Sequence, residues 1–192
     1  MNLLYQKVKN DFLLYFVVMA LYFITGAAGT GKTTICRALK QRGFTTYDVD
    51  EDGFAKWTNI ETGYVHPKSS VKKEQRTPDF LEAHSWNVQK KDIEKLAIKA
   101  KDSDVFLCGS ISNEQELLSL FDKKFTLYVD ANILRKRLAL RTGDNWGSQI
   151  HEIDETLNSY DELNRNYVKL GFIFIDATQS SDAMINQIIS EI

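Results

Sequence analysis

The sequence predicts an α/β fold in a single domain, with a mostly parallel, two-sided β-sheet and helices on both faces. Short apolar runs alternate with longer amphipathic stretches from residue 21 to the C-terminus, as in sheets whose parallel strands are joined by helices. The chain has 192 residues, 43% of them hydrophobic, which is enough for one full core and too little for two ordinary domains.

The first expected strand, residues 21–25, runs into a glycine-rich loop, and a helix-forming stretch, 33–41, follows it. The loop consists of Gly26, Ala27, Ala28, Gly29, Thr30, Gly31, Lys32 and Thr33. Its spacing is that of a phosphate-binding loop, in the strand–loop–helix context which that pattern requires. Glycines let the backbone coil around a phosphate chain, so that N–H groups and the helix N-terminus face the anion. We expect Lys32 to reach the β- and γ-phosphates and Thr33 to bind Mg²⁺. A glycine-rich turn that binds nothing is the alternative.

The N-terminal segment, residues 1–18, is set apart from this unit. An apolar run from Phe12 to Ile24 resembles a secretory signal, but it is short for a membrane span, and cleavage among residues 26–28 would destroy the loop. We therefore expect residues 1–18 to be an extension, either an amphipathic helix or a segment not native to the fold. The domain would be residues 19–192, in a cytoplasmic protein that is a monomer or a homodimer.

Charge and cysteine content exclude some classes of ligand and site. The net charge is −2 and the pI is about 5.9, so stable binding to long nucleic acid is not expected, although a local basic site remains possible. Cys36 and Cys108 both lie in apolar surroundings, which favours two reduced core thiols over a disulfide or a metal site.

The second expected strand, residues 44–49, ends in Asp48-Val49-Asp50. Side chains alternate along a strand, so both carboxylates should lie on one side, at the carboxyl end where open α/β sheets bind ligands. One carboxylate is expected to be an outer Mg²⁺ contact, and the other to orient or deprotonate an acceptor hydroxyl. A solvated acidic turn is the alternative.

An irregular segment follows, residues 53–78, and it could be a mobile flap that determines acceptor specificity. Its basic residues are equally consistent with solvated surface and with an anion or RNA contact; they are Lys68, Lys72, Lys73 and Arg76. The next stretch, 78–101, reads as a helix. His84 and Trp86 could face an acceptor, although aromatic residues in helices more often belong to the core.

The remaining elements continue the alternation of strands and helices. Strands are expected at residues 105–109, 125–129 and 172–175, and helices after a cap at Ser112 or Asn113 and at 131–140, 149–170 and 181–192. In the helix 131–140 and just after it, Arg137 and Arg141 are four residues apart and should share a face, ahead of a polar loop. Two guanidinium groups there suit the clamping of a phosphoryl group, with exposed salt bridges as the alternative.

These motifs resemble the P-loop small-molecule kinases of the nucleoside monophosphate kinase type, which include adenylate, shikimate and gluconate kinases. The loop 26–33 is similar to the family's phosphate loop, and Asp48 and Asp50 resemble the Asp-x-Asp of the shikimate-kinase branch. Arg137 and Arg141 are similar to lid arginines, and residues 176–178 to the turn beside adenine. The resemblance implies a five-stranded parallel sheet in the order 2-3-1-4-5, an acceptor-binding region at about 50–100 and a lid at about 141–149.

The resemblance also implies site residues, with ATP and Mg²⁺ as cofactors and a small-molecule phosphate acceptor as partner. The catalytic residues would be Lys32, Asp50, Arg137 and Arg141. The residues that bind the nucleotide would be Gly26, Ala27, Ala28, Gly29, Thr30, Gly31, Lys32, Thr33, Thr34, Arg137, Asp176, Ala177 and Thr178. Metal would be held by Thr33 and Asp48. Cys108 stands where many P-loop proteins have an acidic residue.

The leading hypothesis is therefore transfer of the γ-phosphoryl group of Mg-ATP to a small hydroxyl-bearing or phosphorylated metabolite. Two alternatives stay open. One is a kinase of nucleic-acid ends or a nucleotide hydrolase, with the basic residues of 68–76 as a polymer contact. The other is a nucleotide-binding module without catalysis, which Cys108 in place of an acid would favour.

Overall fold

The computed structural model describes residues 19–67 and 70–192, so the predicted extension, 1–18, lies outside the described residues. A five-stranded parallel sheet forms the centre, in the order β2-β5-β1-β6-β7. Its strands are β1 (Leu21–Thr25), β2 (Thr45–Asp48), β5 (Val105–Cys108), β6 (Lys123–Tyr128) and β7 (Ile173–Asp176). Numbered among themselves they follow the order 2-3-1-4-5, which confirms the predicted fold.

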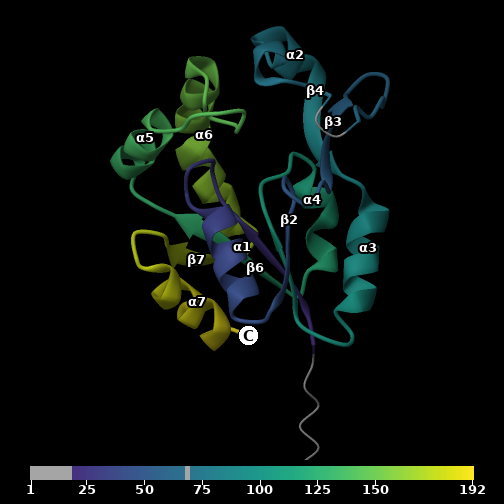
Figure 1. Ribbon diagram of the computed structural model, residues 1–192, viewed down its shortest axis with the longest axis vertical. Helices are drawn as coiled ribbons and strands as arrows, with labels where there is room; N and C mark the ends of the chain where they lie inside the picture. Colours follow the sequence, from purple (N-terminus) through teal and green to yellow (C-terminus); the bar gives the residue numbers. More distant parts are fainter. Residues whose placement is uncertain (1–18, 68–69) are drawn as a thin grey trace, which may run out of the picture.

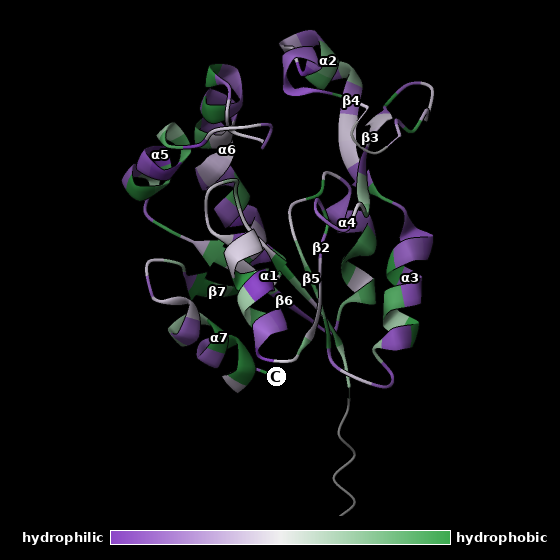
Figure 2. Cartoon of the chain, viewed as in Figure 1, coloured by the Kyte–Doolittle hydropathy of each residue, from purple (hydrophilic) through white to green (hydrophobic). Residues whose placement is uncertain are grey.

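Both faces of the sheet are buried, as the apolar runs predict. In β1, Tyr22 and Ile24 face one core and Leu21 and Phe23 face the other, because side chains alternate along a strand. The first core is covered by α1 (Lys32–Gln41), α5 (Ala131–Ala139) and α7 (Ser181–Ser190), and the second by α3 (Lys90–Lys99) and α4 (Glu114–Leu117). Helix α3 alternates apolar and polar residues accordingly (Figure 2).

The segment 53–101 departs from the prediction. Strand β3 (Ala55–Asn59) pairs antiparallel with β4 (His84–Val88), and the expected helix 78–101 is divided into α2 (Pro78–Ala83), β4 and α3. Trp57 and Trp86 are directly opposite each other in this hairpin, and such cross-strand aromatic pairs stabilise strands. Apolar spacing within 78–101 could not show this, because the stabilising partner is about 30 residues away along the chain.

The hairpin and α2 project beyond the end of the sheet, opposite α5 and α6 (Ile150–Lys169), with the carboxyl ends of the strands between them (Figure 1). Two short 3₁₀ turns, Lys73–Gln75 and Leu118–Leu120, complete the described elements. Within residues 19–67 and 70–192, none of the helices combines the length and the apolarity needed to cross a bilayer.

Candidate active site

The loop 26–33 joins β1 to α1 at the carboxyl edge of the sheet. Gly26 has φ 137°, and a Cβ atom there would lie 2.6 Å from the carbonyl oxygen of Leu127, so the position requires glycine. The Thr30 hydroxyl closes the loop by donating to the Ala27 carbonyl over 2.9 Å. Gly31 occupies the N-cap of α1 and offers no side-chain acceptor to the first N–H groups, which remain available to an anion.

Lys32 folds over this loop. Its Nζ donates to the carbonyl oxygens of Gly26 and Ala27 over 2.8 and 2.9 Å. Burial lowers the pKa of Lys32 to about 8, with a further lowering by Arg141, while Asp50 and Asp48 act in the opposite direction. A phosphate chain in the loop would therefore stabilise the charged ammonium group.

Thr33 and Asp48 are in direct contact. The Thr33 hydroxyl donates to Asp48 Oδ2 over 2.8 Å, and Asp48 Oδ1 accepts from the backbone N–H groups of Asp50 and Glu51. Strand β2 ends at Asp48, so Asp50 lies in the turn beyond it, and the prediction that both carboxylates stand on one side of a strand is wrong. The turn begins earlier than the apolar pattern indicated because Asp48 itself accepts the N–H groups of that turn.

Thr33 and Asp48 offer hard oxygen atoms of the kind that Mg²⁺ prefers. Over the described ranges, no cluster of three or more acidic, histidine or cysteine side chains could hold a metal by itself. The two residues therefore fit a Mg²⁺ ion whose remaining ligands come from phosphate and water.

Asp50 lies on the wall of the cavity that the loop borders. Its carboxylate Oδ1 accepts a hydrogen bond from the Trp86 indole over 3.0 Å. Loss of solvation raises the pKa of Asp50, and the negative charge of Asp48 raises it further, against the opposing effects of Lys32, Trp86 and Arg141. Asp50 thus combines an accessible carboxylate with increased basicity.

The two arginines take different positions. Arg137 on α5 donates to the carbonyl of Thr30 over 3.3 Å and to that of Ala177 over 2.8 Å, which ties the loop to the turn before α7. Helix α5 ends at Ala139, so Arg141 lies beyond the helix rather than on one face with Arg137. Its guanidinium donates to the Trp146 carbonyl; burial lowers its pKa, and the nearby charges of Asp50 and Glu152 partly offset this.

The turn 176–178 borders the cavity at one residue. Asp176 Oδ1 accepts from the backbone N–H and the hydroxyl of Thr178, so these two side chains satisfy each other, and only Ala177 lines the cavity. Gln179 and Met184 line it nearby and were not predicted, since neither stands in a recognisable motif.

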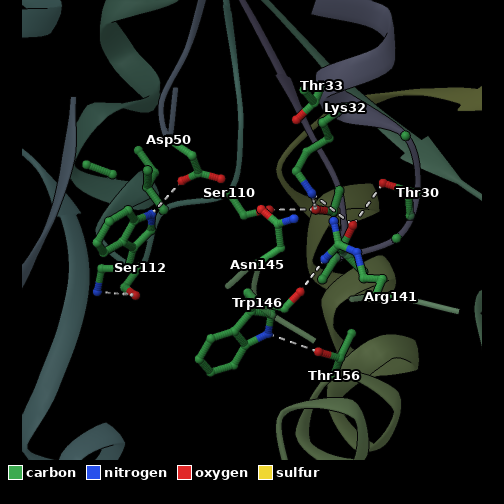
Figure 3. Close-up of a pocket in the computed structure, with 18 of the residues that line it drawn as sticks. Thr30, Lys32, Thr33, Asp50, Ser110, Ser112, Arg141, Asn145, Trp146 and Thr156 are labelled. Carbon is green, nitrogen blue, oxygen red and sulfur yellow. Dashed lines mark hydrogen bonds between the residues drawn. The ribbon is translucent and has the colours of Figure 1, made fainter. Parts of the chain in front are cut away.

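The cavity measures about 1090 Å³, which can hold a nucleotide together with a small second ligand. Lys32, Asp50, Arg141 and Asn145 reach into it from different parts of the chain (Figure 3). Sequence reasoning missed Trp57, Trp146 and Glu114, which also line it. Burial raises the pKa of Glu114 to about 7, against the effects of a hydrogen bond from Tyr167 and the charge of Lys32.

Contacts between the segments 73–76 and 144–152 bridge the cavity, and we call these contacts the insert–lid clasp. Arg76 Nε donates to Glu152 Oε1 over 2.8 Å, and both side chains are buried. The backbone N–H of Lys73 donates to Asp144 Oδ1, and Gln149 Nε2 donates to the Lys73 carbonyl. The Arg76 side chain is thus buried and paired, so it is neither solvated nor free to bind a polymer, and both interpretations of the basic residues are wrong for Arg76. Lys68 lies outside the described residues.

The fold and the loop together define a P-loop α/β protein. A family model described as an AAA domain matches residues 23–157, and the chain belongs to this family. No curated protein matches the sequence.

Solved structures share the fold. A shikimate kinase from Bacteroides thetaiotaomicron is 18% identical, with a TM-score of 0.55, covering 90% of this chain and 99% of its own. A shikimate kinase from Aquifex aeolicus is 16% identical, with a TM-score of 0.56, and the match covers 88% of this chain and 94% of its own. A sugar kinase from Janibacter sp. HTCC2649 is 18% identical, with a TM-score of 0.52, and the match covers 90% of this chain and 93% of its own. The predicted resemblance in fold to P-loop small-molecule kinases, the group that includes shikimate kinases, is confirmed.

Proposed function

We propose that the protein transfers the γ-phosphoryl group of Mg-ATP to a small acceptor through a hydroxyl or phosphate oxygen. The observation that carries this proposal is that Lys32, Asp50 and Arg141 lie around one cavity, close enough for each to alter the pKa of another. A cation for the phosphates, a base and a second cation are the groups that phosphoryl transfer needs. The kinase folds of the structural neighbours support the same reaction.

In this reaction an acceptor oxygen attacks the γ-phosphorus, the bond to the bridging oxygen of ADP breaks, and the acceptor proton passes to Asp50. The loop N–H groups and Lys32 hold the phosphates, while Arg141 stabilises the charge that develops on the transferred group. Bound Mg²⁺ would supply charge neutralisation beside Thr33 and Asp48. Arg137 and Ala177, which are hydrogen-bonded to each other, would border the nucleotide base.

The test measures ADP formation with a panel of nucleosides, nucleotides, sugars and sugar acids, together with the phosphorylated product. We expect turnover with one class of acceptor. Asp50→Asn should lower kcat by about 100-fold or more while leaving the affinity for ATP near normal. Asp92→Asn, an acid on α3 paired with Lys95, is the matched control. ATP binding without turnover on any acceptor would instead support a module without catalysis.

A further inference from the structure

An aromatic surface lies in the acceptor half of the cavity. Trp57 and Trp86, paired across the β3–β4 hairpin, have ring centroids 5.1 Å apart, and Trp146 in the lid lies 6.2 Å from Trp57. All three line the cavity and are only partly buried. We call Trp57, Trp86 and Trp146 the tryptophan wall.

The wall is held in place from behind. Phe80 packs edge-on against Trp57 at 5.4 Å and stacks on His84 at 4.0 Å. The Trp146 indole donates to the Thr156 hydroxyl over 3.2 Å. A fixed indole that keeps part of its surface in a cavity has unused apolar area, which a ligand of matching shape would cover.

The wall adjoins the proposed base. The hydrogen bond from Trp86 to Asp50 fixes the indole beside the carboxylate, so a compound lying on the wall would present its edge to Asp50. The insert–lid clasp bridges the same region and brings Trp146 against Trp57, which favours a small compound over a polymer end.

We propose that the acceptor is a small hydroxyl-bearing ring compound whose ring face stacks on the tryptophan wall. This rests on the proposed function, in that the cavity holds the acceptor. An aromatic base of a nucleoside and the C–H face of a cyclic polyol or sugar would both supply such a ring. An open-chain polyol would not.

Tryptophan fluorescence tests the proposal directly, because the chain has three tryptophans and all belong to the wall. The full-length protein is titrated without ATP with adenosine and other nucleosides, with myo-inositol and pyranose sugars, and with sorbitol and other open-chain polyols. We expect a saturable change with one of the two ring classes and none with the open-chain polyols. The class that responds identifies the source of the ring.

Variants separate stacking from general packing. Trp57→Leu keeps an apolar side chain without an aromatic face and should weaken binding about tenfold, whereas Trp57→Phe should retain most of it. Circular dichroism checks that both variants are folded, and if Trp57→Leu is not, Trp146→Leu with Trp146→Phe is the second pair. Three results would overturn the proposal. They are equal binding of open-chain and ring compounds, no response to any ring compound, and Leu and Phe variants that both bind ring compounds as tightly as the unaltered protein does.

The two proposals fail differently. A ring compound that binds the tryptophan wall but is never phosphorylated would contradict the proposed phosphoryl transfer, while the proposed stacking site would still hold. An open-chain compound that is phosphorylated, with the same KM in the Trp57→Leu variant, would uphold transfer and contradict the stacking site.

Discussion

The indole N–H of Trp86 donates to Asp50 Oδ1 over 3.0 Å, which joins the acceptor hairpin to the turn after β2. This hydrogen bond lowers the pKa of Asp50, against the larger effect of burial, which raises it. Its donor and acceptor are 36 residues apart in the sequence.

Replacing Trp86 by Phe should therefore raise the pKa of Asp50. A base works in its deprotonated form, so activity falls as the pH drops through its pKa. In Trp86→Phe, the acid limb of the kcat/KM profile should move to higher pH. The plateau value of kcat/KM above that limb should change little by comparison. Steady-state kinetics over a pH series measure this. An unmoved limb would show that Asp50 is not the group that titrates.

Lys32→Ala should lower kcat by about 100-fold or more, because it removes the cation closest to the phosphate loop. Lys32 makes its hydrogen bonds to carbonyls of the loop, so the variant should still fold. Coupled ADP assays measure the rate, and thermal unfolding checks the structure. Lys40→Ala, at the exposed last turn of α1, should behave as the unaltered protein. Near-normal turnover in Lys32→Ala would contradict the proposed mechanism.

Breaking the buried pair Arg76–Glu152 should destabilise the fold strongly. Glu152→Ala leaves the Arg76 guanidinium buried without its closest carboxylate, a change that costs about 3–5 kcal/mol in other proteins. It also removes the acceptor for the N–H groups of Gly147, Ser148 and Gln149. Urea unfolding gives the free energy of unfolding.

The control is an exposed pair on α3. Glu94→Ala removes the partner of Lys90, 3.9 Å away and solvated, and should change stability by less than about 0.5 kcal/mol. Similar effects of the two substitutions would mean that the insert–lid clasp does not stabilise the fold.

Glu114 should make stability depend on pH. Burial raises its pKa from 4.5 to about 7, so between these values the folded protein binds more protons than the unfolded chain, and stability falls as the pH rises. The free energy of unfolding should fall by about 3 kcal/mol between the two pKa values, at about 1.4 kcal/mol per pH unit. Glu114→Gln should flatten this slope in urea unfolding at several pH values. If the free energy of unfolding fell equally steeply with pH in both proteins, Glu114 would not be the group responsible.

The sequence was most informative where structure is local. The loop 26–33 and its flanking strand and helix are one continuous segment, and the spacing of fixed residues predicted them. The five central strands were predicted as well, since burial on both faces leaves short, continuous apolar runs.

Long-range pairing was the part that sequence reasoning missed. The β3–β4 hairpin depends on Trp57 meeting Trp86, and the clasp depends on Arg76 meeting Glu152, 76 residues away. Periodicity describes one segment at a time, so it placed Trp86 in a helix, and it left Arg76 in a basic run that was either solvated surface or an anion or RNA contact. Arg137 and Arg141 were predicted to share a helix face, but α5 ends at Ala139, so only Arg137 lies on the helix, although both arginines line the cavity.

The insert–lid clasp holds two surface loops by their backbones as much as by their side chains. Main-chain groups of Lys73, Arg76 and Asp144 take part, each with a side chain of the opposite segment as its partner, the carbonyl of Arg76 with His151 and that of Asp144 with Arg76. Such contacts depend both on where each loop passes and on the few side chains that reach the opposite backbone. The two loops should therefore tolerate substitutions outside these pairs, whereas inserting or deleting a residue in one would require a matching change of length in the other.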